Sequence, residues 1–180
     1  MRRAFEYGGI VASVVLIVAG TASVVMGITG RDRVRDDLGR ERIVGTPDSS
    51  IPGQLVDTGK EAEAFSAVMR RHALEATDGR TYSEMGRFID SNGEETDDEE
   101  KAAKDPETGQ PAENGARNIW VTETALSTAL NVAYFAERVS EFAIVMGVAL
   151  LLTGIGFLVL TLSVLRGPPR TAGSGAATAG

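Results

Sequence analysis

Residues 118–147 read NIWVTETALSTALNVAYFAERVSEFAIVMG, and this stretch passes from a water-soluble pattern to a membrane-like one. In its first half apolar residues recur at nearly helical spacing, which is typical of an amphipathic helix. Its second half begins a block without charged residues, and no Gly or Pro interrupts the change. The pattern therefore predicts one helix from about Asn118 to Leu165, roughly 70 Å long at about 1.5 Å per residue.

Two apolar blocks determine the fold class. Tyr7 to Thr29 and Phe142 to Leu165 contain no Asp, Glu, Lys, Arg or His. A helix of about 20 residues crosses the roughly 30 Å hydrocarbon layer of a bilayer. We therefore expect a mainly α protein, a transmembrane hairpin of helices 7–29 and 142–165 with a helical, partly disordered extracytoplasmic insertion, residues 30–141, between them.

The first block has a second interpretation. Arg2 and Arg3 before an apolar run resemble the start of a cleaved or twin-arginine export signal. However, the apolar run continues to Ile28, beyond the small residues Thr21-Ala22-Ser23 where cleavage would fall. An uncleaved anchor is the favoured interpretation.

The short tails predict the orientation. Residues 1–6 carry Arg2 and Arg3, and residues 166–180 carry Arg166 and Arg170 without an acid. Positive residues next to a span favour the cytoplasmic side. Both tails, the second of them disordered, should be cytoplasmic. Because Arg greatly outnumbers Lys and Ala and Gly are abundant, we expect a bacterial plasma membrane.

The composition of residues 30–141 excludes several functions. The segment holds 14 Lys and Arg against 24 Asp and Glu, a net charge of −10, which disfavours nucleic acid as a partner. The chain has no Cys, so it has no disulfide or thiolate site. Only 19 of residues 31–139 are Leu, Ile, Val or Phe, so stability should depend on the flanking spans.

Charge pairs, Pro and Gly residues and a capping box divide the first part of this segment into predicted helices and a loop. Residues 30–45 read as a solvated extension of the first span, with Arg33–Asp37 and Asp36–Arg40 pairs, rather than as an anion-binding Arg cluster. A Pro/Gly loop follows at 46–57. The capping box Thr58 to Glu61 opens a helix at about 59–77. Its predicted apolar face holds Phe65, Met69, His72, Ala73 and Ala76.

A second capping box, Thr81 to Glu84, predicts a short helix that carries Tyr82, Met85, Phe88 and Ile89. Residues 91–116 form the one biased segment and should be a mobile acidic loop. Its acids do not fit the calcium helix-loop-helix pattern, because Glu95 occupies the Gly position. Instead, Thr96 should cap a short helix in which Lys101 and Lys104 pair with Asp97 and Glu100.

Asn118 is the expected cap of the long last helix. Its apolar positions are Trp120, Leu126, Leu130, Ala133, Ala136 and Val139, and its expected exposed positions are Thr122, Glu123, Asn131, Glu137 and Arg138. We take Trp120, Leu126 and Leu130, at the outer end, as candidate partner-binding residues.

The residue inventory of the chain gives little support for a catalytic or metal site. His72, with Glu75 or Glu84 as an orienting carboxylate, is the one candidate acid–base group, and a packed histidine is the favoured interpretation. One His without Cys cannot supply the ligands of a catalytic zinc or non-haem iron site. We therefore predict no catalytic residue, no metal site and no cofactor.

Small residues recur along both spans at near-heptad spacing. The candidate helix-packing residues are Gly20, Gly27, Gly147 and Gly154. Such residues let helix backbones approach closely in lipid. The simpler interpretation is that the two spans pack against each other, and homo-oligomerisation through a further face is the alternative.

Four stretches resemble a group of uncharacterised actinobacterial two-span membrane proteins. They are GRDRVRDDLGRERIVGTPD, RRHALEATDGRTYSEMGRFID, KAAKDPETGQP and the segment from Asn118 to Leu162. Similar sequences are sometimes named aromatic ring-opening dioxygenase, but this chain lacks the ligands for the iron. The resemblance implies a two-span membrane protein and brings no site residues.

Three functions remain. The leading hypothesis is a two-pass, non-enzymatic scaffold whose partners are the lipid bilayer and another membrane protein or a second copy. The second is an extracytoplasmic sensor or accessory subunit that signals through a partner. The third is an enzyme that uses His72.

Overall fold

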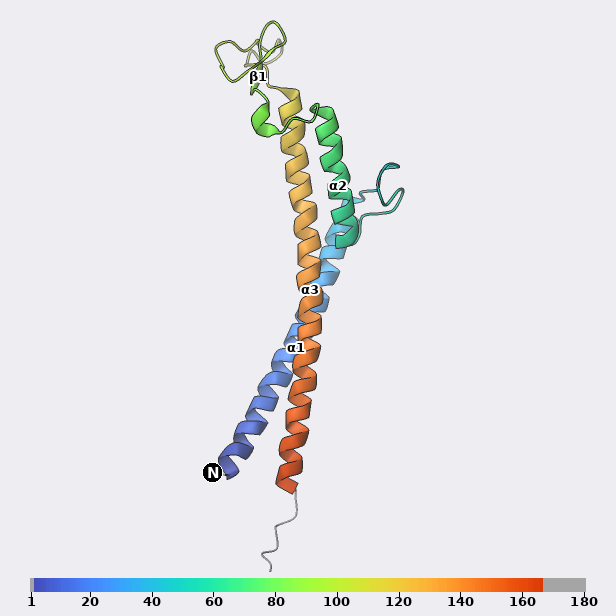
Figure 1. Ribbon diagram of the computed structural model, residues 1–180, viewed down its shortest axis with the longest axis vertical. Coiled ribbons are helices and arrows are strands. Elements are labelled where there is room, and N and C mark those ends of the chain that lie inside the picture. Colours follow the sequence, from blue (N-terminus) through green and yellow to red (C-terminus); the bar gives the residue numbers. More distant parts are fainter. Residues whose placement is uncertain (1, 167–180) are drawn as a thin grey trace, which may run out of the picture. The chain divides into compact units, whose positions relative to one another are not determined.

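The computed structural model describes residues 2–166. Its helices are α1 (Arg2–Glu41), α2 (Gly59–Ala76) and α3 (Gly115–Arg166), with a short 3-10 helix η1 (Tyr82–Glu84) and strands β1 (Phe88–Ile89) and β2 (Glu95–Thr96) (Figure 1). The mainly helical prediction is confirmed. Of the predicted tails, residues 2–6 belong to α1, and residues 167–180 lie outside the described residues.

The chain forms two compact units. Within the described residues, we call residues 2–27 with 142–166 the apolar unit, and residues 28–141 the polar unit. Helices α1 and α3 each contribute residues to both units.

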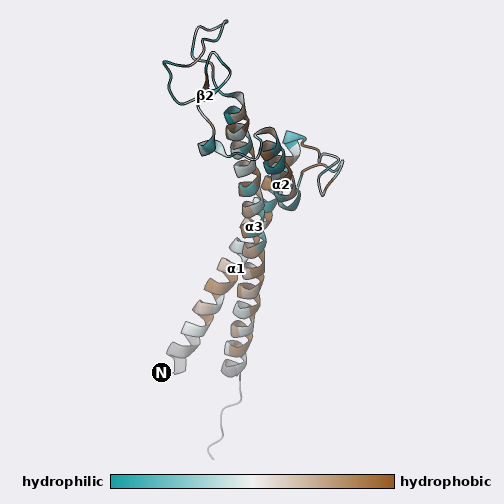
Figure 2. Ribbon diagram, turned by 45° about the horizontal axis from the view of Figure 1, so that its top comes forward, coloured by the Kyte–Doolittle hydropathy of each residue, from teal (hydrophilic) through white to brown (hydrophobic). Residues whose placement is uncertain are grey.

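Two helices are long and apolar enough to cross a membrane. Only 11% of the most apolar window of each is buried, which separates them from the core helix of a soluble protein. In the apolar unit, large side chains such as Val18, Met26 and Phe142 are more than half exposed. The colouring of Figure 2 shows the same hydrophobic character along these segments.

Within the apolar unit, α1 and α3 approach each other at glycines. A Cβ atom on Gly20 would lie 2.7 Å from the carbonyl oxygen of Gly147, and one on Gly154 would lie 2.8 Å from Cγ1 of Ile17. Gly27, the fourth candidate helix-packing residue, is also buried. Only glycine leaves room for such contacts, in agreement with the small-residue pattern.

In the polar unit, α1 ends at Glu41, four residues before the predicted end. Arg42 adopts a left-handed conformation (φ 52°), and Val44 then pairs with Leu55 to close the predicted loop. Arg40 pairs with Asp37 at 3.2 Å rather than with Asp36.

Helix α2 begins as the sequence predicts. The Thr58 side chain accepts from the amide of Glu61, whose own carboxylate accepts from the amide of Thr58. Its buried positions are Gly59, Ala62, Phe65, Ser66, Val68 and Ala73. Of the predicted face, Phe65 and Ala73 are therefore buried, and Ala76 is exposed.

Two apolar clusters form the core of the polar unit. The larger joins the three helices and the loop through Leu38, Val56, Ala62, Phe65 and Leu130. The smaller contains Ala73, Met85 and Trp120. In Figure 1, α2 lies beside the part of α3 that supplies Trp120 and Leu130.

The segment after α2 differs from its prediction. The second capping box forms, but η1 ends at Glu84, and Phe88 and Ile89 pair with Thr96 and Glu95 in an antiparallel ladder. A two-residue alternation is too short to be recognised as a strand.

The predicted helix after Thr96 is wrong. Residues 99–101 form a turn. The carboxylate of Asp98 accepts from the amide of Glu100, a local bond that competes with helix formation. Lys101 pairs with Asp98, and Asp97 pairs with Arg117.

The start of α3 also differs. Asn114, and not Asn118, caps the helix, because its side chain accepts from the amide of Ala116. Asn118 lies inside the helix and donates to Glu113. The predicted continuous helix itself is confirmed from Gly115 to Arg166.

Candidate functional site: the outward face of helix α3

Helix α3 has an unusual distribution of charge in the polar unit. Glu123 and Glu137, both predicted to be exposed, are buried, with 2% and 5% of their surface accessible. This corrects the sequence-based assignment of the polar face. Each buried carboxylate needs hydrogen-bonding partners, because an unpaired buried charge is strongly unfavourable.

Glu137 connects three helices. Its carboxylate accepts from Nε of Arg35 on α1 at 2.6 Å and from the amide of Gly59, the first residue of α2, at 2.5 Å. A helix N-terminus favours negative charge. The hydrogen bond with Glu137 raises the pKa of Arg35, which stays charged. A Cβ on Gly59 would lie 2.7 Å from Glu137 Oε2 and 2.9 Å from Cα of Tyr134, so this close approach of α2 to α3 requires glycine.

Glu123 makes a second connection between α2 and α3. It accepts from Arg70 at 3.3 Å and from the Ser127 hydroxyl at 2.6 Å. The Arg70 guanidinium also lies over the ring of Trp120, 4.1 Å from its centroid. The two acids of this part of α3 therefore connect α3 with α1 and α2 in the polar unit.

The opposite side of α3 is apolar and exposed. We call six residues the α3 stripe: Val121, Ala125, Thr128, Val132, Phe135 and Val139. They alternate at spacings of four and three residues, and all are exposed, Val132 by 60% and Phe135 by 67%. From Ile119 to Val139, Arg138 is the one charged residue among the exposed positions.

A groove between α1 and α3 flanks the α3 stripe. It has a volume of about 510 Å³. We call it the α1–α3 groove; it is lined by Val34, Asp37, Leu38, Glu41, Ile43, Leu126, Ala129, Leu130, Val132, Ala133 and Ala136. Its lining is mainly apolar, with two acids from α1.

The structure separates the three predicted partner-binding residues. Leu126 and Leu130 both line the α1–α3 groove, although Leu130 is only 3% exposed. Trp120 is buried against Ala73 and Met85 instead. The three therefore do not form one exposed surface, because the sequence pattern that selected them marks the core-facing side of α3.

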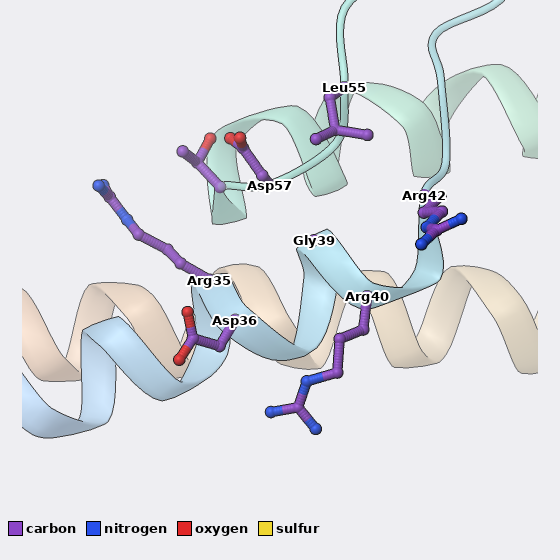
Figure 3. A pocket seen from close by; sticks show the side chains of 8 residues that line it. Arg35, Asp36, Gly39, Arg40, Arg42, Leu55 and Asp57 are labelled. Atoms are coloured by element: carbon purple, nitrogen blue, oxygen red, sulfur yellow. The ribbon is translucent and has the colours of Figure 1, made fainter.

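A larger hollow of about 620 Å³ lies at the end of α1. Arg35, Arg40 and Arg42 line it together with Asp36 and Asp57 (Figure 3). Figure 3 shows that Arg35 and Arg40 point in different directions, so the guanidinium groups do not converge on one ligand. Arg35 and Arg40 are paired with acids. This arrangement does not favour the anion-binding alternative.

Two carboxyl groups beside this hollow influence each other. Burial, followed by the hydrogen bond with Glu61, raises the pKa of Asp57. Burial opposes ionisation of Glu61 as well, but hydrogen bonds from the amides of Asp57 and Thr58 lower its pKa overall. Glu61 therefore keeps the negative charge that the capping box uses.

His72 has a different partner from those predicted. Its Nε2 lies 2.7 Å from a carboxylate oxygen of Asp48, and not beside Glu75 or Glu84. Arg71 binds the same carboxylate oxygen. Among the described residues, no hydroxyl group is hydrogen-bonded to His72. The pair therefore attaches loop 46–57 to α2.

Within residues 2–166, no three His, Asp or Glu side chains come together in a group that could hold a metal ion. No protein-family model, curated protein or solved structure matches the chain. The geometry of α3 is therefore the main evidence on function.

Sequence reasoning missed the α3 stripe although its signal is present. Positions 121, 125, 128, 132, 135 and 139 hold no charged residue. A stripe through Trp120, Leu126 and Leu130 has similar periodicity, and periodicity alone does not decide which apolar face is buried.

Proposed function

We propose that the chain is a two-pass integral membrane protein whose polar unit lies outside the cytoplasm and binds another polypeptide through the α3 stripe. The two apolar segments are the proposed spans. Their length and their outward-facing Val, Leu and Phe side chains support insertion into lipid, since water would hydrate this surface unfavourably. The role is that of a non-enzymatic scaffold.

The distribution of charge on α3 is the observation that supports partner binding. The buried face holds both acids, and the exposed face holds Val, Ala, Thr and Phe. Contiguous exposed apolar surface is typical of protein interaction sites. Helix α2, in the same unit, exposes Lys60, Glu63, Arg70 and Glu75, so an uncharged exposed face is specific to α3.

The enzyme hypothesis has less support. The His72–Asp48 pair is shared with Arg71 and has no nucleophile beside it in the described part of the chain. A dioxygenase iron site of the usual kind needs two His and a carboxylate, and the chain has one His. The resemblance to two-span membrane proteins is consistent with the proposal and stays a prediction.

Photo-crosslinking in living cells tests this function. A photoreactive amino acid replaces Val132 on the α3 stripe, and the control carries it at Ala67, an exposed position of α2. We expect the probe at position 132 to give a discrete covalent adduct with a polypeptide, and the control to give none. Uncrosslinked monomer alone from both positions would contradict the proposal.

A further inference from the structure

We propose that the partner on the α3 stripe is a second copy of this chain, packed in parallel so that each stripe residue meets its own counterpart. This inference rests on the proposed function, because anchoring in one membrane gives both copies the same orientation. It adds the identity of the partner and the geometry of the contact.

The spacing of the stripe favours a helix as the occupant. From Val121 to Val139 the stripe positions are spaced by four, three, four, three and four residues, so every second position repeats after seven residues, or 3.5 per turn. This is the period at which one helix stays in contact with another along its length. In a parallel two-fold pair, Val132 meets Val132 and Phe135 meets Phe135 without any adjustment of register.

Lipid does not account for the whole stripe. Val139 is near the predicted membrane surface, but Val121 lies about 27 Å further along α3 at 1.5 Å per residue. The polar headgroup layer is only about 5–8 Å thick on each side. The outer part of the stripe therefore lies in water unless protein covers it.

The α3 stripe is the part of the polar unit where charge opposes a second copy least. The polar unit is strongly acidic, so most of its surfaces would repel the same surface of another copy. Beside the stripe, the flanking positions hold Thr122, Thr124, Ala129, Asn131, Ala136 and Arg138, of which Arg138 alone is charged. Charges at such flanking positions normally select or exclude partners in helix pairs. Here the single flanking charge, Arg138, is paired with Glu141 at 2.7 Å, so the flanks oppose self-association only weakly.

The small area of the stripe implies that the pair is stable only while both copies are anchored in one membrane. A strip about 27 Å long and about 10 Å wide covers roughly 270 Å² per copy, well below the roughly 800 Å² per partner of a stable soluble complex. Confinement in one membrane raises the effective concentration and compensates for a small interface. The pair should therefore be studied in native membranes.

Single cysteines test the proposal directly, because the chain has none of its own. Val121→Cys, Val132→Cys and Val139→Cys are expressed separately and oxidised mildly in native membranes, with Ala67→Cys as the exposed control. We expect each stripe variant to form a disulfide-linked dimer, and the control to remain monomeric. Adding Val132→Glu should reduce the Val121→Cys dimer at least several-fold, since it places like charges opposite each other.

Three results would overturn the parallel pair. Dimer formation only at Val132 would indicate an antiparallel contact, and equal dimer formation by Ala67→Cys would indicate random collision. A photo-adduct at Val132 with a different protein, without any disulfide-linked dimer, would retain the proposed function and reject the second copy.

Discussion

Glu137 shows how a single residue organises the polar unit. A glutamate next to Arg138 on a helix is expected to be exposed to solvent. The carboxylate of Glu137 is instead hydrogen-bonded to α1 and α2 and so connects both of them with α3. Buried ion pairs add little stability over a well-packed apolar alternative, but removing one partner is strongly destabilising. Glu137 is therefore needed for the arrangement of the helices around it.

We predict that Glu137→Ala destabilises the polar unit by about 2–4 kcal/mol, because Arg35 and the amide of Gly59 lose their acceptor. The control is Glu141→Ala, which removes an exposed pair with Arg138 and should change stability by less than about 1 kcal/mol. Urea unfolding in detergent, followed by the fluorescence of Trp120, measures the polar unit specifically, because Trp120 is the only tryptophan and is buried there. Equal unfolding midpoints for the two variants would contradict this role.

At the scale of elements, the packing of α1 against α3 in the apolar unit depends on glycine. The backbone of Gly20 lies against that of Gly147, without space for a methyl group. Close backbone approach increases van der Waals contact, which drives helix association in lipid. The contact explains why small residues recur in these otherwise bulky apolar segments.

We predict that Gly20→Ala weakens this helix pair by about 1–3 kcal/mol, because the added methyl group forces the backbones apart. Gly8→Ala is the matched control on the same helix, since a Cβ there has no atom within 4 Å. SDS titration, followed by energy transfer between dyes on one introduced cysteine per helix, measures the separation. A Gly20→Ala protein that resists SDS as well as Gly8→Ala would show that the close contact is unnecessary.

The long helices and the capping of α2 could be predicted because their signals are local. Charge-free blocks and the Thr58–Glu61 spacing determine structure from neighbouring residues alone. The cap of α3 and the β1–β2 ladder were missed because Asn114 and Asn118 are equally plausible caps, and two-residue strands have no periodic signal. The burial of Glu123 and Glu137 depends on Arg70 and Arg35, far away in sequence, which no local pattern reveals.

At the scale of the whole molecule, the chain combines two apolar segments of membrane-spanning length with a polar unit whose exposed α3 face is apolar. The resemblance to two-span membrane proteins, the predicted tails and the outer location of residues 30–141 are expectations of this account. Together they require that lipid shields the apolar unit and that the polar unit is accessible from outside the cell.

Cysteine labelling in intact cells tests these two requirements most directly. Val18, on α1, is 63% exposed in the isolated chain, and Ala67, on α2, is also exposed. A soluble protein would therefore react at both positions. With a membrane-impermeant maleimide, the account predicts that Ala67→Cys is labelled in intact cells and that Val18→Cys reacts only after denaturation in SDS. Labelling of Val18→Cys in native membranes, or labelling of Ala67→Cys only after cell lysis, would contradict it.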